Sequence, residues 1–176
     1  MIKFFFKIFV WFRDKFNPTK LPTNKEEWNK VRKLSFQEFS DWVNSFTYLS
    51  DPLSGFFDKT ETFEHFIDPN IKSGRDCDDF AEMFKLWGIF NKRKAYTVVI
   101  TIKAHPFKKS HIVTVLYDDS TKKYTLCNYT HAIEADTLEE AIDKIRQWKT
   151  YKDGYIYAIQ CTKEALTEEE IKVWEN

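Results

Sequence analysis

The sequence is poor in the residues that build disulfide scaffolds and metal clusters. Its three cysteines, Cys77, Cys127 and Cys161, are an odd number, lie far apart and form no CxxC pair. No cluster of cysteine and histidine has the spacing of a zinc site. The pattern argues against a disulfide framework and a structural metal, and it fits a reducing compartment. We expect no cofactor and a cytoplasmic or virion-associated protein.

An excess of one charge is also missing. Lys plus Arg number 27 and Asp plus Glu number 27, so the formal net charge is zero. Without a basic excess, long-range attraction to nucleic acid is absent, and we expect no nucleic-acid partner. Glycine is scarce, with four residues, and Lys, Asn, Phe and Ile are abundant. This composition suits an AT-rich bacterial or phage gene.

No apolar run is long enough to cross a bilayer. The most apolar stretch, residues 1–16 (MIKFFFKIFVWFRDKF), is short and interrupted by basic residues. Charged residues follow it directly, where a signal peptide would have a small-residue cleavage site. Two interpretations stay open: peripheral contact with a membrane surface, or a terminal helix or strand that packs against the domain or a partner subunit. We favour packing.

Apolar and aromatic side chains, in contrast, are plentiful. Of the 176 residues, 43% are hydrophobic and 18% aromatic, which is enough to fill one sizeable core. We expect an apolar aromatic segment and linker at residues 1–22 and a single domain at residues 23–176.

The first half of the chain has the periodicity of helices. Residues 48–70, which lie between two of the predicted helical regions, contain Asp-Pro twice. This segment reads as a long ordered loop of the kind that often contributes to a substrate cleft. The predicted helices are residues 24–34 capped by Thr23, 36–46 capped by Ser35, a short one near 62–66, and a central one from 76 or 77 to 91, whose apolar stripe is Phe80, Ala81, Phe84 and Trp87.

The second half is rich in Val, Ile, Thr and Tyr and predicts an antiparallel sheet. The fold class is therefore α+β, with N-terminal helices, including a central cysteine-bearing helix, packed on that sheet. The predicted strands are 95–103, 111–117, 123–130 and 154–161, and the predicted helices are 138–148 after Thr137 and a terminal one over 168–174 after Thr167.

Cys77 lies where a turn containing Gly74 delivers it to the first turn of the central helix. Unpaired N–H groups and the positive end of the helix dipole favour a thiolate at such a place and can also hold an oxyanion. Asp76 and Asp79 resemble a capping pair, so part of the acidic content has a structural explanation. Because these acidic neighbours oppose the thiolate, a nearby cation is needed.

His111 opens an apolar strand and is the candidate for that cation. If the polar turn DDSTKK joins two strands, Tyr117 faces Tyr124, and Asn128 shares a face with His111. An amide oxygen there can fix the imidazole tautomer, as in a Cys-His-Asn triad. With a turn one residue shorter, Cys127 takes that face instead.

These motifs resemble the transglutaminase-like branch of papain-like proteins, especially bacterial transglutaminase-like cysteine proteinases and related phage proteins. The resemblance covers roughly residues 46–130. It rests on Gly74 to Ala81, which matches the family's cysteine motif, and on the strand that begins with His111. Tyr48, Asp51 and Gly55 match the segment before the motif. The family's catalytic Asp falls on Cys127 or on Asn128, depending on the alignment.

The resemblance implies a papain-like core and a cysteine peptidase or amidase without a cofactor, acting on a protein or peptide. The Cys77/His111 ion pair would attack a peptide or glutamine-type amide and form a thioester. The Cys77 N–H is one expected oxyanion donor. The second donor is open, with Gln37 a candidate by residue type only. The alternative is an inactive transglutaminase-like module for binding or assembly, for example in a phage virion.

The remaining polar residues carry weaker signals. His65, His105 and His131 are expected at the surface, outside the strand pairing. Asp78 and Asp79 beside a cysteine lack the alternating oxygen ligands of a calcium loop, so no metal is predicted.

Overall fold

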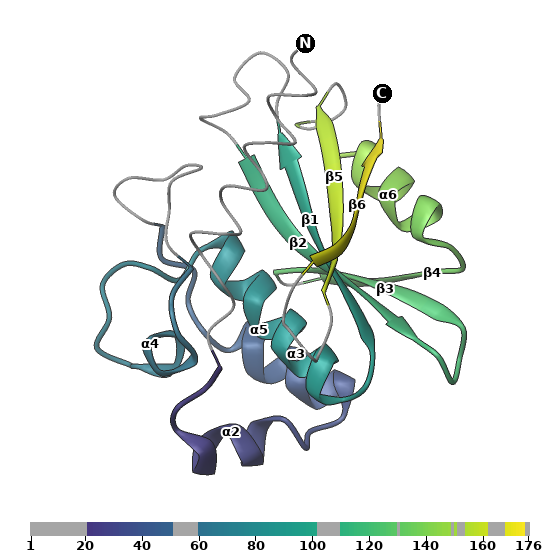
Figure 1. Ribbon diagram of the computed structural model, residues 1–176. Coiled ribbons are helices and arrows are strands. Elements are labelled where there is room, and N and C mark those ends of the chain that lie inside the picture. The colour runs from purple at the N-terminus through teal and green to yellow at the C-terminus, as the bar shows by residue number, and fades with distance from the viewer. Residues whose placement is uncertain are drawn as a thin grey trace.

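Helices pack on a six-stranded antiparallel sheet in this α+β protein, as its computed structural model shows (Figure 1). The structure describes residues 21–50, 60–101, 110–129, 131–148, 150, 154–161 and 168–174. The strand order is β4-β3-β2-β1-β5-β6. The elements are α2 (Lys25–Val31), α3 (Phe36–Asn44), α4 (Phe63–Ile67), α5 (Cys77–Phe90), β1 (Lys94–Thr101), β2 (Ser110–Asp118), β3 (Lys123–Asn128), β4 (His131–Ala135), α6 (Leu138–Arg146), β5 (Tyr155–Cys161) and β6 (Glu168–Trp174).

Strands β1 to β3 form the predicted meander, and its register is the predicted one. Tyr117 is paired with Tyr124, and Val115 with Leu126, as expected from the polar turn between β2 and β3. The turn closes through Lys122, whose φ of 58° lies in the left-handed region. Strand β5 extends the sheet, as predicted, and it does so by pairing with the free side of β1.

The edges of the sheet differ from the sequence predictions. The terminal helix expected over 168–174 is wrong: this segment is β6, paired antiparallel with β5 from Ile156↔Trp174 onward. Three consecutive glutamates favour a helix start locally, but pairing satisfies the backbone groups that β5 would otherwise present at an open edge. Strand β4 was not predicted, because its residues are mostly exposed and give no clear alternation of apolar and polar side chains.

Helix caps follow the predicted residues in most cases. Ser35 caps α3 in a full capping box with Glu38, and Thr137 caps α6 by accepting from the Glu140 N–H. For α2 the predicted cap is one residue off: Asn24, not Thr23, accepts the N–H of Glu27. Among the residues described, no helix combines the length and apolar character that a membrane crossing requires.

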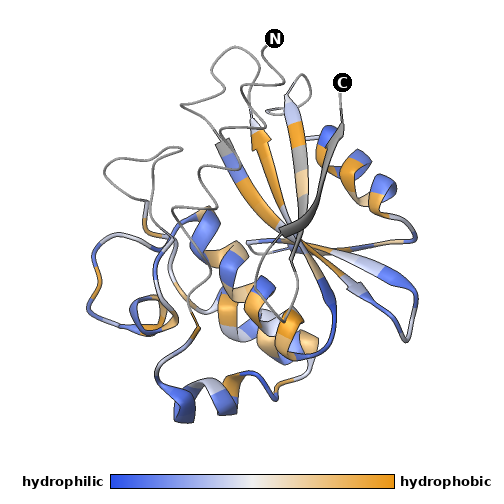
Figure 2. Cartoon of the chain, viewed as in Figure 1, coloured by the Kyte–Doolittle hydropathy of each residue, from blue (hydrophilic) through white to orange (hydrophobic). Residues whose placement is uncertain are grey.

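The sheet has an apolar cluster on each face. One lies under α5 and α3 and includes Leu116 and Cys127, and the other lies under α6 and includes Val113 and Val115. Figure 2 shows apolar residues along β1 and β2, in the middle of the sheet. Alternation along β2 therefore separates its side chains into an α5 layer and an α6 layer.

Helix α5 is buried on all its sides, not only along the predicted apolar stripe. Residues 78–89 are all buried, including Glu82 and Lys85, whose side chains form an ion pair at 2.5 Å. The helix also approaches the sheet closely at Gly88, where a Cβ atom would collide with Cδ2 of the fully buried Leu116. This close packing fixes the position of the helix that carries Cys77.

Candidate active site

Cys77 is the first residue of α5, as the sequence predicts, and it is partly exposed. Gly74, with a φ of 76°, makes the turn before it. Asp76 is the N-cap, with its Oδ1 accepting the Asp78 N–H at 3.3 Å, and Asp79 Oδ2 accepts the Asp76 N–H at 3.1 Å. This capping box confirms the structural role expected for Asp76 and Asp79.

The acidic residues around Cys77 also bind the segment that precedes α4. Asp78 Oδ2 accepts from the Thr60 hydroxyl at 3.0 Å, and Asp79 Oδ1 accepts from the Glu61 N–H at 2.7 Å. All three aspartates at this helix end are at least nine-tenths buried. Each therefore has a role in the fold, apart from any role in chemistry.

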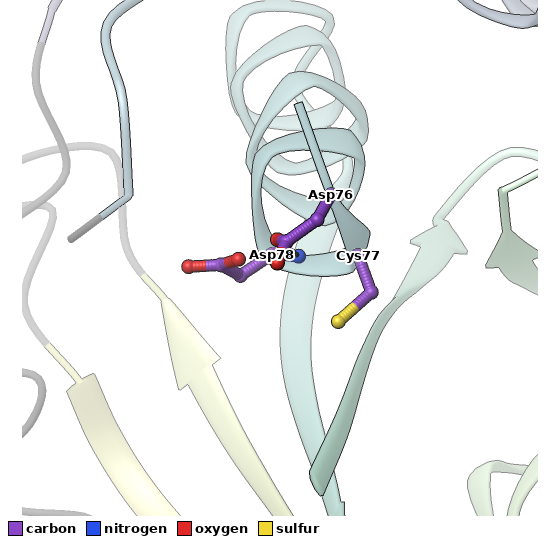
Figure 3. A group of neighbouring side chains, drawn as sticks. All are labelled: Asp76, Cys77 and Asp78. Atoms are coloured by element: carbon purple, nitrogen blue, oxygen red, sulfur yellow. Dashed lines mark hydrogen bonds between the residues drawn. The ribbon is translucent and has the colours of Figure 1, made fainter. Parts of the chain in front are cut away.

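Asp76, Cys77 and Asp78 project from the N-terminal end of α5 and together resemble a metal-binding group (Figure 3). One potential ligand atom from each lies within 4.8 Å of the other two. Both carboxylates already accept hydrogen bonds within the chain, from the Asp78 N–H and from Thr60. The helix cap accounts for the cluster, and the absence of a metal stays a prediction.

Arg75 ties the cysteine turn to two earlier segments, a role that the sequence did not reveal. Its buried guanidinium donates to the carbonyls of Phe66 and Asp68, each at 2.9 Å, and lies 4.9 Å from the ring centroid of Phe46. Its backbone pairs with Leu49 in both directions, at 2.9 and 3.1 Å. Arg75 thus connects the start of α5 both to the segment before residue 51 and to the segment after residue 59.

His111 and Asn128 lie together, as the predicted register requires. The Nε2 of His111 is 2.8 Å from the Oδ1 of Asn128. An amide oxygen only accepts, so Nε2 carries the proton, and Nδ1 is the basic nitrogen of the neutral ring. This is the tautomer that an orienting asparagine is expected to hold.

Cys127, the alternative third residue, faces the other layer. It is 1% exposed within the α5 cluster, and its Sγ donates to the Thr125 carbonyl at 3.6 Å. Burial raises the pKa of the Cys127 thiol far above its ordinary value. Cys127 is core packing, whereas the side chain of Asn128 is beside the imidazole.

The surroundings of His111 disfavour its charged form. The ring lies 6.1 Å from that of Trp148, on the α6 side of the sheet. Burial lowers the pKa of His111 below its ordinary value, and the hydrogen bond with Asn128 opposes this shift only in part.

Cys77 and His111 lie at the same end of the molecule but belong to different layers. Thr114 donates to the Ala81 carbonyl at 2.6 Å, and Leu116 meets Gly88 further along, so β2 and α5 run in the same direction. The start of β2 therefore lies beside the start of α5. Thr114 and Leu116 face α5, however, and alternation directs His111 to the α6 layer. The sequence predicts a histidine that faces the core helix, and this orientation is not the one found. His111 can therefore meet the Cys77 thiol only at the start of β2.

Gln37, considered as an oxyanion donor, is exposed on α3. Its Nε2 donates to Asp41 Oδ1 at 2.9 Å, within its own helix. Nothing in this arrangement connects Gln37 with Cys77, and the second donor is still open.

The other histidines differ in part from the prediction. His131 is exposed as expected, but it lies in β4, paired with Asn128, and not outside the strands. His65 is half-buried rather than at the surface, with Nε2 3.2 Å from the Ser73 carbonyl oxygen. His105, Asp51, Gly55 and the segment 1–16 lie outside the described residues.

Comparison with known proteins adds no relative: no family model, no curated protein and no solved structure matches this chain.

Proposed function

We propose that the protein is a cysteine peptidase or amidase with a papain-like, transglutaminase-like core. The observation that carries the proposal is the 2.8 Å hydrogen bond between His111 Nε2 and Asn128 Oδ1. It leaves Nδ1 as a base at the strand end beside which α5 begins with Cys77. Nucleophile, base and orienting group are the parts that covalent catalysis by a thiol requires.

In the proposed reaction, Nδ1 of His111 accepts the thiol proton while the Cys77 sulfur bonds to the carbonyl carbon of the amide. The Cys77 N–H, at the first position of α5, donates to the developing oxyanion. The C–N bond then breaks, His111 returns its proton to the leaving amine, and a thioester remains. Water, deprotonated by His111, attacks the thioester, releases the carboxylic acid and restores the thiol.

The charges around Cys77 and His111 disfavour a permanent thiolate–imidazolium pair. They favour a neutral His111 that accepts the thiol proton during the attack. The helix dipole supports a thiolate, but Asp76, Asp78 and Asp79 oppose it, and burial lowers the pKa of His111. The ion pair expected from sequence alone is therefore weakened. Removal of His111 should still slow the reaction of the Cys77 thiol, because it takes away the imidazole that is proposed to accept the thiol proton.

Protein or peptide amides are the proposed substrates, with water as the acyl acceptor. A lysine amine as acceptor would instead give crosslinking. The proposed location is cytoplasmic or virion-associated, and a partner subunit or membrane surface would meet residues 1–16.

A second candidate is an inactive module that keeps the fold for binding or assembly. The observation in its favour is the alternation along β2, which directs His111 to the layer opposite α5.

Site-resolved alkylation of the thiols separates the two candidates. The wild type, His111→Ala and His131→Ala are treated with iodoacetamide between pH 5 and 9, and labelling is followed by mass spectrometry. His131 is the matched control, because it is an exposed histidine in β4, two strands away from His111. An enzyme should show Cys77 labelled at pH 7 at least about tenfold faster in the wild type than in His111→Ala, with His131→Ala equal to the wild type. A Cys77 that is labelled at the same rate in all three proteins at every pH would leave the inactive module.

A further inference from the structure

The residue after Asn128 has an unusual backbone conformation. Tyr129 has a φ of 44°, in the left-handed region that non-glycine residues rarely adopt. The other described non-glycine residues with positive φ are Lys92 and Lys122, both exposed. Tyr129, by contrast, is a half-buried aromatic residue. Such strain persists only where the surrounding structure holds it.

The turn between β3 and β4 requires this conformation. Asn128 pairs with His131, so two residues, Tyr129 and Thr130, connect the strands. Two-residue hairpin turns need positive φ at their first central residue or at both, and they favour Asn, Asp or Gly there. A tyrosine at the first position is therefore a poor choice for the turn itself, and its side chain must account for it.

The ring of Tyr129 packs against the start of α5. Its centroid lies 4.5 Å from that of Phe80, edge to face at 87°, and 5.2 Å from that of Tyr48, at 82°. Phe80 is in the first turn of α5, three residues after Cys77, and is 1% exposed. Tyr48 in turn stacks on Phe80 at 6.3 Å and 11°.

Neighbouring residues of one tight turn thus reach the two halves of the site. Asn128 binds the imidazole in the α6 layer, and Tyr129 packs on the helix that carries the thiol in the α5 layer. Because the backbone at Tyr129 is held in one conformation, a shift of either half is transmitted to the other.

We propose that Tyr129 is a positioning residue that fixes the start of α5, and hence Cys77, relative to the His111–Asn128 pair. The inference rests on the function proposed above. Its physical basis is that proton transfer and nucleophilic attack need the sulfur and the basic nitrogen in one geometry, and that small displacements cost much rate.

The test measures how far His111 accelerates the alkylation of Cys77. The readout is the ratio of the Cys77 rate at pH 7 with His111 present to the rate with His111→Ala, determined in each background. In Tyr129→Gly, which accepts the positive φ but lacks the ring, the ratio should fall from its wild-type value to near one. Tyr129→Phe keeps the ring and should restore it. Lys122→Gly is the matched control, since it removes the same kind of strain from a turn at the opposite end of β3, and its ratio should equal that of the wild type.

A folded Tyr129→Gly protein with the wild-type ratio would overturn the positioning role and leave the proposed function intact. A ratio of one in the wild type would instead overturn the proposed function, and this inference with it. If Tyr129→Gly does not fold, Tyr129→Asn replaces it, because asparagine tolerates the left-handed conformation and also lacks the ring.

Discussion

Nε2 of His111 lies 2.8 Å from Oδ1 of Asn128, across two neighbouring strands. The contact depends on the register between β2 and β3, which pairs Tyr117 with Tyr124 through a short polar turn. An asparagine holds the ring without adding charge, whereas an aspartate in its place would also stabilise the imidazolium. That difference can be tested directly.

Asn128→Asp should raise the pKa of His111 and shift the acid limb of Cys77 reactivity to higher pH, because His111 must be neutral to accept the thiol proton. A carboxylate in hydrogen-bonding contact with an imidazole favours the charged ring by about 1–3 pKa units. The pKa follows from ¹⁵N NMR of the imidazole, and the reactivity from the pH profile of iodoacetamide labelling. Asn128→Ala is the control and should slow labelling at every pH, because the ring loses its orientation. An aspartate variant with an unchanged His111 pKa would show that residue 128 does not contact the ring in solution.

Stability should depend on pH through His111. Burial lowers the pKa of His111 in the folded protein, below the unfolded value of about 6.5. At a pH between these two pKa values the unfolded chain binds more protons than the folded protein does. The contribution of neutral His111 to stability is therefore complete above about pH 7 and is lost as the pH falls through the folded pKa. Urea unfolding at pH 7.5 and 5.5 should therefore show a larger loss for the wild type than for His111→Gln.

The control for this pH effect is His131→Gln, which removes an exposed histidine from β4, two strands away from His111. Its pH dependence should equal that of the wild type. If His111→Gln also loses as much stability as the wild type on acidification, His111 does not titrate below its ordinary pKa.

Replacement of Arg75 by lysine should destabilise the fold by about 2–3 kcal/mol. The guanidinium, in a residue that is 5% exposed, donates to the carbonyls of Phe66 and Asp68, and a single ammonium cannot reproduce that fork. The free energy of unfolding in urea measures the effect.

Arg32→Lys is the matched control for Arg75→Lys. Arg32 donates through Nε to Asn29 at an exposed site, so the same substitution should cost less than about 0.5 kcal/mol. Equal effects at the two positions would mean that the buried hydrogen bonds of Arg75 contribute nothing measurable.

Much of the fold follows from local signals in the sequence. The polar turn specifies the register of β2 and β3, and with it the neighbourhood of His111 and Asn128. The glycine turn and the acidic caps predict the start of α5 at Cys77. Both signals lie within a few residues of the feature that they predict, which is why single-sequence reasoning detects them.

The remaining features depend on contacts between distant parts of the chain. Residues 168–174 have the local character of a helix, yet they pair with β5, because the edge of the sheet offers them hydrogen bonds that no local pattern records. The layer that His111 faces depends on which side of the sheet α5 covers. The role of Arg75 depends on carbonyls 7 and 9 residues before it. None of these can be read from spacing alone.

The order of strands across the sheet has a consequence for how the chain assembles. The pairings among β1, β2, β3 and β4 join segments that follow one another, so they can form with short loops to close, whereas β5 must find β1 across the whole of the intervening meander. Contacts of short sequence separation form faster. His111 and Asn128 both belong to the early group. During synthesis the base and its orienting partner can therefore be in register before β5 and β6 have left the ribosome.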